Sequence, residues 1–317
     1  MTFLTVAICT YNRKWFLQQC LSELLPQILN FQDVRILIID NNSTDETAEL
    51  IKALQVKHSY LDYVFCPDQG LSYARNCALE QCNSAWLSFL DDDAYPNDDW
   101  LEQNLELIKS AKYDAFGGVY LPWFKDGKSS WFKECYETNF FRMPKEETRL
   151  APGDPYFSGG NCSFKVYPIR ASGGFPLTLG MNGKVMGYGE EVAAQRSMAI
   201  NGYVLGFSSH LVIHHYVPLS KQSIRWAWRR EYYKGRDFWS IYSKPPILKN
   251  IILYTKVRFK ESFNLSRNVI SKCFSIRHSE SIKNVCYEMS VWAGLIGLIT
   301  GAFKIKISSL KRFIAIS

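Results

Sequence analysis

Three consecutive aspartates, Asp91, Asp92 and Asp93, are the part of the sequence best suited to chemistry. They follow the apolar, strand-like run of residues 85–90 and precede a turn. Adjacent carboxylates repel one another, and a divalent cation that binds oxygen would relieve the repulsion. Because side chains alternate along an extended backbone, we expect Asp91 and Asp93 to share one face while Asp92 points away. The alternative is a solvated acidic turn that caps a helix beginning near Asp98.

Polar clusters also follow two other apolar runs. Thr10-Tyr11-Asn12-Arg13 follows the first run, and Asp40-Asn-Asn-Ser-Thr-Asp45 follows the second. Short apolar runs alternate with amphipathic stretches up to residue 120, which predicts a mostly parallel α/β sheet flanked by helices, with ligands beyond the carboxyl ends of its strands. The expected strands are residues 4–8, 34–39, 60–65, 85–90 and 115–120, and the expected helices are residues 15–28, 47–54, 71–81 and 100–108.

Composition and missing motifs exclude several classes of protein. The 317 residues are 47% hydrophobic and 21% charged, which is typical of a globular chain. No Gly-x-Gly-x-x-Gly or Gly-x4-Gly-Lys-Ser/Thr pattern follows the first run, which argues against a dehydrogenase or a P-loop enzyme. Nine scattered cysteines without a Cys-x-x-Cys pair indicate neither a zinc ribbon nor a disulfide framework. Because residues 3–8 read as a first strand with no basic leader, we expect a cytosolic protein.

The net charge of +7 is divided unevenly along the chain. Residues 221–317 carry 19 Lys/Arg and 5 Asp/Glu, a net charge of +14, whereas residues 1–220 carry a net charge of −7. The basic part contains the uncharged run Met289 to Phe303, which at 15 residues is shorter than the roughly 20 that span a bilayer. This run is interpreted either as a buried helix or as a basic, apolar element on an anionic membrane surface.

Aromatic residues crowd a polar, turn-rich stretch between residues 120 and 160. Flat rings beside polar groups suit the apolar faces of sugars, and a second small core is the alternative interpretation. The aromatic residues concerned are Trp123, Phe124, Trp131, Phe132, Tyr136, Phe140 and Phe141.

Taken in order, the motifs resemble those of the family 2 glycosyltransferases, which have the GT-A fold. The resemblance extends from residue 4 to about residue 216, and the motifs are specific as an ordered set although each is weak alone. The matching motifs are Thr10-Tyr11-Asn12-Arg13, Asp40-Asn-Asn-Ser-Thr-Asp45, Gly70-Leu-Ser-Tyr-Ala-Arg75-Asn76, Asp91-Asp92-Asp93 at the family's Asp-x-Asp, Gly159-Gly160-Asn161 at its Gly-Gly-Asn, and Gly189-Glu190-Glu191 at its Gly-Glu-Asp.

The resemblance implies a GT-A catalytic domain over residues 1–220, followed by a basic, mainly helical region over residues 221–317. Within the domain, residues 1–120 would bind the nucleotide and residues 121–220 the acceptor. The implied reaction is the inverting transfer of a single sugar from a nucleotide-diphosphate sugar, a UDP-sugar in most such enzymes, to a glycan or lipid-linked glycan. No nucleic acid is involved, and we expect an enzyme at the cytoplasmic face of the membrane.

Two other functions remain open from the sequence: a catalytically silent nucleotide-sugar-binding protein and a sugar nucleotidyltransferase. Intact Asp91, Asp93 and Glu191 favour an enzyme over a silent relative. A nucleotidyltransferase should carry a glycine-rich loop after its first strand, and residues 10–14 contain no glycine.

Carried over residue by residue, the resemblance assigns most strand-end residues to the nucleotide sugar. The region of Tyr11 and Asp40 would hold the base, since a carboxylate can accept a hydrogen bond from a ring N–H; the alternative for Asp40 is a loop residue that caps a helix. Arg75 would brace the nucleotide pocket, and its alternative is a surface cation. The whole assigned set is Thr10, Tyr11, Asn12, Arg13, Asp40, Asn42, Arg75, Asp91, Asp92, Gly160 and Asn161.

The resemblance also implies a metal site and a general base. Asp93, with Asp91, would bind the Mn²⁺ or Mg²⁺ that neutralises the departing diphosphate, and His214 is a further candidate ligand; the alternative for His214 is a surface histidine. Glu191 would take the proton of the acceptor hydroxyl. Glu190 is the second candidate, because the family's usual Asp is a longer Glu here.

One further pattern, Gln222-x-x-Arg225-Trp226, resembles the Gln-x-x-Arg-Trp motif of processive polysaccharide synthases. Those enzymes carry several membrane spans, and no segment long enough to span is expected here. A single-sugar transferase is therefore preferred to a processive synthase.

Overall fold

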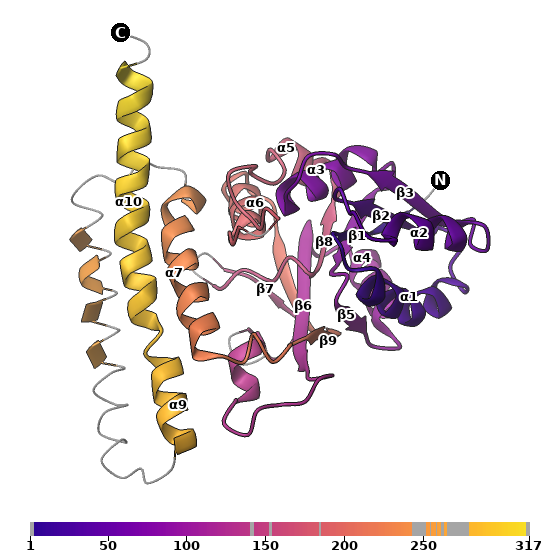
Figure 1. Cartoon of the computed structure of the whole chain (residues 1–317). Coiled ribbons are helices and arrows are strands. Elements are labelled where there is room, and N and C mark those ends of the chain that lie inside the picture. Colours follow the sequence, from indigo (N-terminus) through magenta and orange to yellow (C-terminus); the bar gives the residue numbers. More distant parts are fainter. Residues whose placement is uncertain are drawn as a thin grey trace.

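A mixed sheet with helices on both faces and a C-terminal pair of long helices make up the computed structural model (Figure 1). The structure describes residues 3–139, 143–151, 154–183, 185–242, 252–253, 255–257, 259–260, 263–264 and 279–314. The strands are β1 (Leu4–Thr10), β2 (Val34–Asp40), β3 (Leu61–Phe65), β4 (Trp86–Leu90), β5 (Ala94–Pro96), β6 (Ala115–Trp123), β7 (Thr148–Arg149), β8 (Asn161–Lys165) and β9 (Leu205–Tyr216). The helices are α1 (Lys14–Ile28), α2 (Thr47–Gln55), α3 (Leu71–Gln81), α4 (Trp100–Lys109), α5 (Val166–Ala171), α6 (Glu190–Ile200), α7 (Ile224–Ile241), α9 (Ser279–Glu288) and α10 (Val291–Ile314), with a short 3₁₀ turn η1 (Glu134–Glu137).

The sheet has the strand order β3-β2-β1-β4-β8-β6-β9-β5, and β7 pairs with β9. β1, β2, β3 and β4 pair in parallel with one another, as the alternating pattern predicts. β8 runs antiparallel between β4 and β6, so the second half of the sheet is mixed. Thr10 pairs with Asp40, and Leu90 pairs with Asn161. The polar clusters that follow these strands therefore meet at one edge of the sheet.

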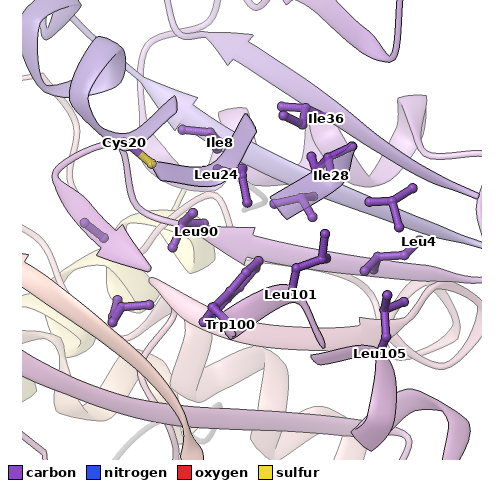
Figure 2. Packing of buried hydrophobic residues seen from close by; sticks show 14 of the residues in the cluster. Leu4, Ile8, Cys20, Leu24, Ile28, Ile36, Leu90, Trp100, Leu101 and Leu105 are labelled. Atoms are coloured by element: carbon purple, nitrogen blue, oxygen red, sulfur yellow. The ribbon is translucent and has the colours of Figure 1, made fainter. Parts of the chain in front are cut away.

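Hydrophobic layers cover both faces of the parallel strands. Leu4 and Ile8 of β1 belong to the layer formed with Leu24 and Ile28 of α1, which Figure 2 shows beside them. Ala7, on the opposite face of β1, belongs to the layer that includes α3 and α6. Burial on both faces explains why these strands are continuous apolar runs rather than alternating ones.

A smaller core joins the aromatic stretch after β6 to the C-terminal helices. Trp131 and Phe132 pack with Ala227 of α7 and Tyr287 of α9. The ring of Tyr136 stacks on that of Tyr287, with the ring centroids 4.0 Å apart. The interpretation as a second small core is therefore confirmed for Trp131, Phe132 and Tyr136, whereas Trp123 packs against the rings of Tyr95 and Tyr216. Two other aromatics of the stretch, Phe140 and Phe141, lie outside the described residues.

α10 lies along α7, and glycines bring the two backbones together (Figure 1). A Cβ atom on Gly297 would lie 1.9 Å from the carbonyl oxygen of Tyr232. A Cβ atom on Gly235 would lie 2.0 Å from the carbonyl oxygen of Gly294. Only a residue without a side chain fits at such distances, so these glycines set the spacing of the helices.

The stretch Lys283–Ala302 is 20 residues long and, by length and composition alone, apolar enough to cross a bilayer. This corrects the expectation that no segment is long enough, which rested on the uncharged run Met289 to Phe303 and left out the preceding residues at the end of α9. Within the fold, 44% of the stretch is buried. A buried helix of a water-soluble protein passes the same test, so the finding does not by itself assign a membrane span.

Replacing Gly297 with alanine should lower the free energy of unfolding by about 1–3 kcal/mol, because the added methyl group overpacks the contact with α7. Urea or thermal unfolding measures this loss. Ile296→Ala, at a neighbouring position whose side chain is 54% exposed, is the matched control and should change stability by less than about 0.5 kcal/mol. Equal stability of the two variants would contradict the close approach of the helices.

Candidate functional site

A cavity of about 380 Å³ lies at the edge of the sheet where β1, β2 and β4 end. Its walls also come from the start of α3, the loop before β8, the start of α6 and the beginning of α7. Of the residues assigned from the sequence, those that line it are Thr10, Tyr11, Arg13, Arg75, Asp91, Asp92, Asp93, Gly160, Glu190 and Glu191. The structure therefore brings together residues that are up to 181 positions apart in the chain.

Asp92 is buried beside the end of β1 and the residue before α1. It accepts hydrogen bonds from the Thr10 hydroxyl at 2.8 Å and from Arg13 Nη1 at 2.9 Å. Burial raises the pKa of Asp92 to about 6, although the Arg13 guanidinium opposes the rise. Asp92 thus anchors the loop that carries its two neighbours.

Asp93 is buried between a guanidinium and an imidazole. Arg13 Nη1 lies 2.8 Å from one of its oxygens, and His215 Nε2 lies 3.2 Å from the other. Burial opposes the ionisation of Asp93, but His215 and Arg13 outweigh it and hold the pKa of Asp93 well below its ordinary value. The group is therefore an ionised carboxylate at neutral pH.

Asp91, Asp93 and His215 form a group that could hold a metal ion, since one ligand atom from each lies within 4.8 Å of the others. His215 takes the place expected for His214. Neighbouring residues of β9 point to opposite faces of the sheet, and the ring of His214 contacts Asn97 at 3.2 Å in a separate cavity. The assignment of His214 as a metal ligand is therefore corrected to His215.

Several assigned nucleotide-binding residues organise the loops instead of lining the cavity. The Asn12 side-chain oxygen accepts the backbone N–H of Thr44 at 2.7 Å. Asp40 is buried and accepts the Tyr63 hydroxyl at 3.1 Å. Asn42 is exposed with a positive φ of 66°, which is typical of a tight turn. These residues hold the loops at the cavity edge, and they are not among the described residues that line the cavity.

Asn41 contributes to the cavity wall but is missing from the sequence assignment. Its side chain accepts the backbone N–H of Gly70 at 2.7 Å and donates to the carbonyl of Asp68 at 2.6 Å. It thereby links the loop after β2 to the start of α3. The signal was present, because Asn41 lies inside the second motif between the two residues that were chosen, Asp40 and Asn42.

The Gly159-Gly160-Asn161 motif fits closely under the charged residues. A Cβ on Gly160 would lie 2.0 Å from the Asp91 carboxylate, and one on Gly159 would lie 2.4 Å from the Arg75 guanidinium. Asn161 is fully buried and donates to backbone carbonyls of β6 and β9. Its assignment to the nucleotide sugar is corrected: Asn161 joins strands of the sheet, and the two glycines leave room for the site.

Arg75 is a buried cation of the site and not the surface cation that was its alternative interpretation. It is only 4% exposed, and its guanidinium lies 2.6 Å from Glu190 and 3.8 Å from Asp91. Burial and the neighbouring Glu191 raise the pKa of Glu190 above its ordinary value, while the Arg75 guanidinium opposes the rise. Glu191 is partly exposed and lines the cavity. Of the two glutamates, Glu191 is therefore the one open to a substrate.

Residues outside the family motifs also line the cavity, among them Tyr188, Lys221 and Trp226. Trp226 belongs to the Gln222-x-x-Arg225-Trp226 pattern, which resembles a motif of processive polysaccharide synthases. Gln222 is buried and accepts the backbone N–H of Ser129 at 2.7 Å, which fixes the start of α7. This pattern in the sequence therefore marks residues that form the cavity wall.

Solved structures and curated relatives place this architecture among known proteins. The mannosyltransferase PcManGT from Pyrobaculum calidifontis, solved in complex with GDP-Man and Mn²⁺, aligns with a TM-score of 0.68 over 93% of this chain and 86% of that chain, at 17% sequence identity. The succinoglycan biosynthesis protein ExoM of Rhizobium meliloti is 25% identical, with 73% of this chain and 72% of the relative covered.

A second relative is the dolichyl N-acetyl-alpha-D-glucosaminyl phosphate 3-beta-D-2,3-diacetamido-2,3-dideoxy-beta-D-glucuronosyltransferase of Methanococcus voltae, 30% identical over 57% of this chain and 65% of the relative. The family model for glycosyl transferase family 2 matches residues 5–173, more than half of the chain. The expected GT-A fold is confirmed, and the chain belongs to family 2 of the glycosyltransferases.

Proposed function

We propose that this glycosyltransferase moves a single sugar, with inversion at the anomeric carbon, from a nucleoside-diphosphate sugar to a hydroxyl of a glycan or lipid-linked glycan. The observation that carries the proposal is the arrangement of the cavity. The carboxylate and imidazole group of Asp91, Asp93 and His215 and the carboxylate of Glu191 line the same cavity. The cavity can therefore bind a charged leaving group and an acceptor hydroxyl next to each other.

The metal-binding group suits a cation such as Mn²⁺. Two carboxylates and one imidazole form a donor set that Mn²⁺ accepts readily, whereas Mg²⁺ favours oxygen ligands alone. Asp91, Asp93 and His215 would hold the cation, which when bound supplies positive charge to the departing nucleoside diphosphate. Arg13 and Lys221 add positive charge to the same wall. The Mn²⁺ in the PcManGT structure supports this choice by analogy of fold.

Glu191 is our candidate for the general base. It stands in the first turn of α6 and lines the cavity, while Arg75 holds its neighbour Glu190 at 2.6 Å in a buried ion pair. A base must accept a proton from the acceptor oxygen as that oxygen attacks, so it needs contact with the substrate. Glu190 is better suited to hold the geometry of Arg75 than to meet an acceptor.

The donor binds, in this proposal, along the ends of β1 and β2. Thr10, Tyr11 and Asn41 form that wall, and Arg75 lies beneath it. The acceptor class is suggested by the relatives: the Methanococcus voltae enzyme is named for a dolichyl-linked sugar phosphate and ExoM for succinoglycan biosynthesis. A screen of UDP-, GDP- and dTDP-sugars for Mn²⁺-dependent hydrolysis tests the proposal. Binding without hydrolysis or transfer would instead indicate a silent nucleotide-sugar-binding protein.

Metal binding should depend on His215 and not on His214. We expect Asp93→Ala to abolish Mn²⁺-dependent binding of the nucleoside diphosphate and His215→Ala to weaken Mn²⁺ binding on the order of 10-fold or more, since each removes a ligand. His214→Ala, at the adjacent position on the other face of β9, is the matched control and should bind Mn²⁺ like the wild type. Calorimetry with Mn²⁺ measures all three, and the reverse order of the two histidine variants would contradict the assignment.

Glu191→Gln keeps the size of the side chain but removes its basicity. We expect donor affinity to be retained and turnover to fall on the order of 100-fold or more, because proton transfer from the acceptor is lost. Steady-state kinetics and donor titration separate the two quantities. A large loss of turnover in Glu190→Gln, with Glu191→Gln close to wild type, would assign the base to Glu190.

We further propose that residues 221–317 hold the enzyme on the cytoplasmic face of an anionic membrane. The region carries a net charge of +14. Large apolar side chains among its described residues are solvent-exposed, and lysines lie between them, which is the composition of a helix at a lipid surface. The exposed residues are Ile252, Leu253, Lys256, Val257, Phe259, Lys260 and Phe263.

Sedimentation with liposomes tests this proposal. We expect binding to anionic vesicles that weakens as salt rises, because each basic residue near such a surface contributes about 1 kcal/mol before screening. Combining Phe259→Ser with Phe263→Ser should reduce the salt-resistant part of the binding. Val56→Ser, at an apolar position that is 88% exposed on the catalytic domain, is the control and should have no effect. Absence of vesicle binding at low salt would contradict the proposal.

A further inference from the structure

The segment that leads into α6 is held by α7. Arg236 donates from Nη2 to the carbonyl oxygen of Met186 at 3.0 Å, and Asp237 accepts the backbone N–H of Tyr188 at 3.1 Å. Tyr188 lines the cavity, and Glu190 and Glu191 follow it after a single glycine. A helix from the C-terminal region therefore contacts the backbone directly before the glutamates.

The glycine between them is also in contact with α7. Gly189 has a φ of 89°, a left-handed conformation that glycine adopts without strain. A Cβ at this position would lie 2.3 Å from the Cδ1 atom of Ile241, so the side chain of Ile241 packs directly on the backbone where α6 begins. The N-cap residue Gly189 has no side chain to close the first turn of α6. Contacts from other elements, α7 among them, therefore fix the start of α6.

Asp237 is the polar centre of this contact. The residue is 7% exposed, and its oxygens also accept Arg236 Nε at 2.6 Å and Arg236 Nη2 at 2.8 Å. A buried carboxylate is costly unless it is paired and hydrogen-bonded. The bonds to Arg236 stay within α7. The bond to the Tyr188 N–H instead connects α7 to the loop before α6. That bond is charge-assisted and stronger than a neutral one.

α7 itself is well supported. The close glycine contacts with α10 hold one side of it, and Trp239 donates from Nε1 to the carbonyl oxygen of Leu298 at 2.9 Å. The same helix carries Trp226 into the cavity wall. Because α7 is packed firmly against α10 and contacts the loop before α6, it can fix the position of Glu191.

We infer that Asp237 is a positioning residue for the carboxylate pair of α6, and that α7 completes the active site in addition to any membrane role. The inference rests on the proposed function of Glu191. Asp237 acts through the backbone of Tyr188 and does not itself line the cavity. Because Thr10, Asn41 and the aspartates bind the donor from the strand ends, a displaced α6 should lower turnover and leave donor binding intact.

Two substitutions separate positioning from general stability. In Asp237→Ala the Tyr188 N–H loses its acceptor, and we expect kcat to fall about 10- to 100-fold with an unchanged donor Kd, since a displacement of about 1 Å near the reacting atoms can cost that much. Asp237→Asn keeps an oxygen that can accept the same N–H, so it should retain most of the activity.

Asp114→Ala is the matched control. Asp114 also accepts a backbone N–H, that of Val204 at 2.9 Å, and pairs with Lys165 at 2.9 Å, but it is not among the described residues that line the cavity. We expect it to lower the melting temperature while kcat stays at the wild-type value. An equal loss of kcat in Asp114→Ala and Asp237→Ala would overturn the positioning role.

Amide hydrogen exchange gives a readout that is independent of activity. The amides of residues 188–191 should exchange faster in Asp237→Ala than in the wild type and close to the wild-type rate in Asp237→Asn. Unchanged exchange or wild-type kcat in Asp237→Ala would overturn the inference. A wild-type enzyme that neither hydrolyses nor transfers from any donor would instead overturn the proposed function, and the two failures are therefore distinguishable.

Discussion

The buried guanidinium of Arg75 is the interaction on which the rest of the site depends, because it joins the strand ends to α6. It pairs with Glu190 at 2.6 Å and lies 3.8 Å from Asp91, while Phe89 and Phe175 flank it at 5.7 Å. In such surroundings an unpaired cation would be costly, and so would the carboxylates without it. The charges can be buried only together. The position of α6 relative to the aspartates therefore follows from electrostatics as much as from the apolar core.

Arg13 pairs with the other two aspartates, as Arg75 pairs with Asp91. It bridges Asp92 and Asp93, and His215 occupies the remaining oxygen of Asp93. Arg13 and His215 thus hold Asp92 and Asp93 in place, with Asp92 used for support and Asp91 left as the most exposed of the three. A cation that binds Asp93 must therefore compete with Arg13, whereas His215 would join the aspartates as a ligand.

The sequence predicted the parallel strands and the aspartate cluster well because both depend on local patterns. Buried strands read as apolar runs, and charges at their ends are conspicuous. The choice between His214 and His215 failed for another reason: it depends on which face of β9 each residue takes, and β6 and β9 change register between Gly118 and Val119. Asn161 was misassigned because a motif gives the position of a residue but not the direction of its side chain. Its burial is decided by three strands distant in sequence.

The net charge of the chain changes near residue 220, but contacts in the fold cross this boundary. The change in net charge near residue 220 is visible in the sequence. Gln222 and Asp237 contact the catalytic half through long-range hydrogen bonds, and Trp226 lines the cavity from the start of α7, so no periodicity of the sequence predicts these contacts. The basic C-terminal region therefore also forms part of the cavity wall. If α7 lies on the membrane, the proposed base Glu191 is held at a fixed distance from the lipid surface, which suits an acceptor attached to a lipid.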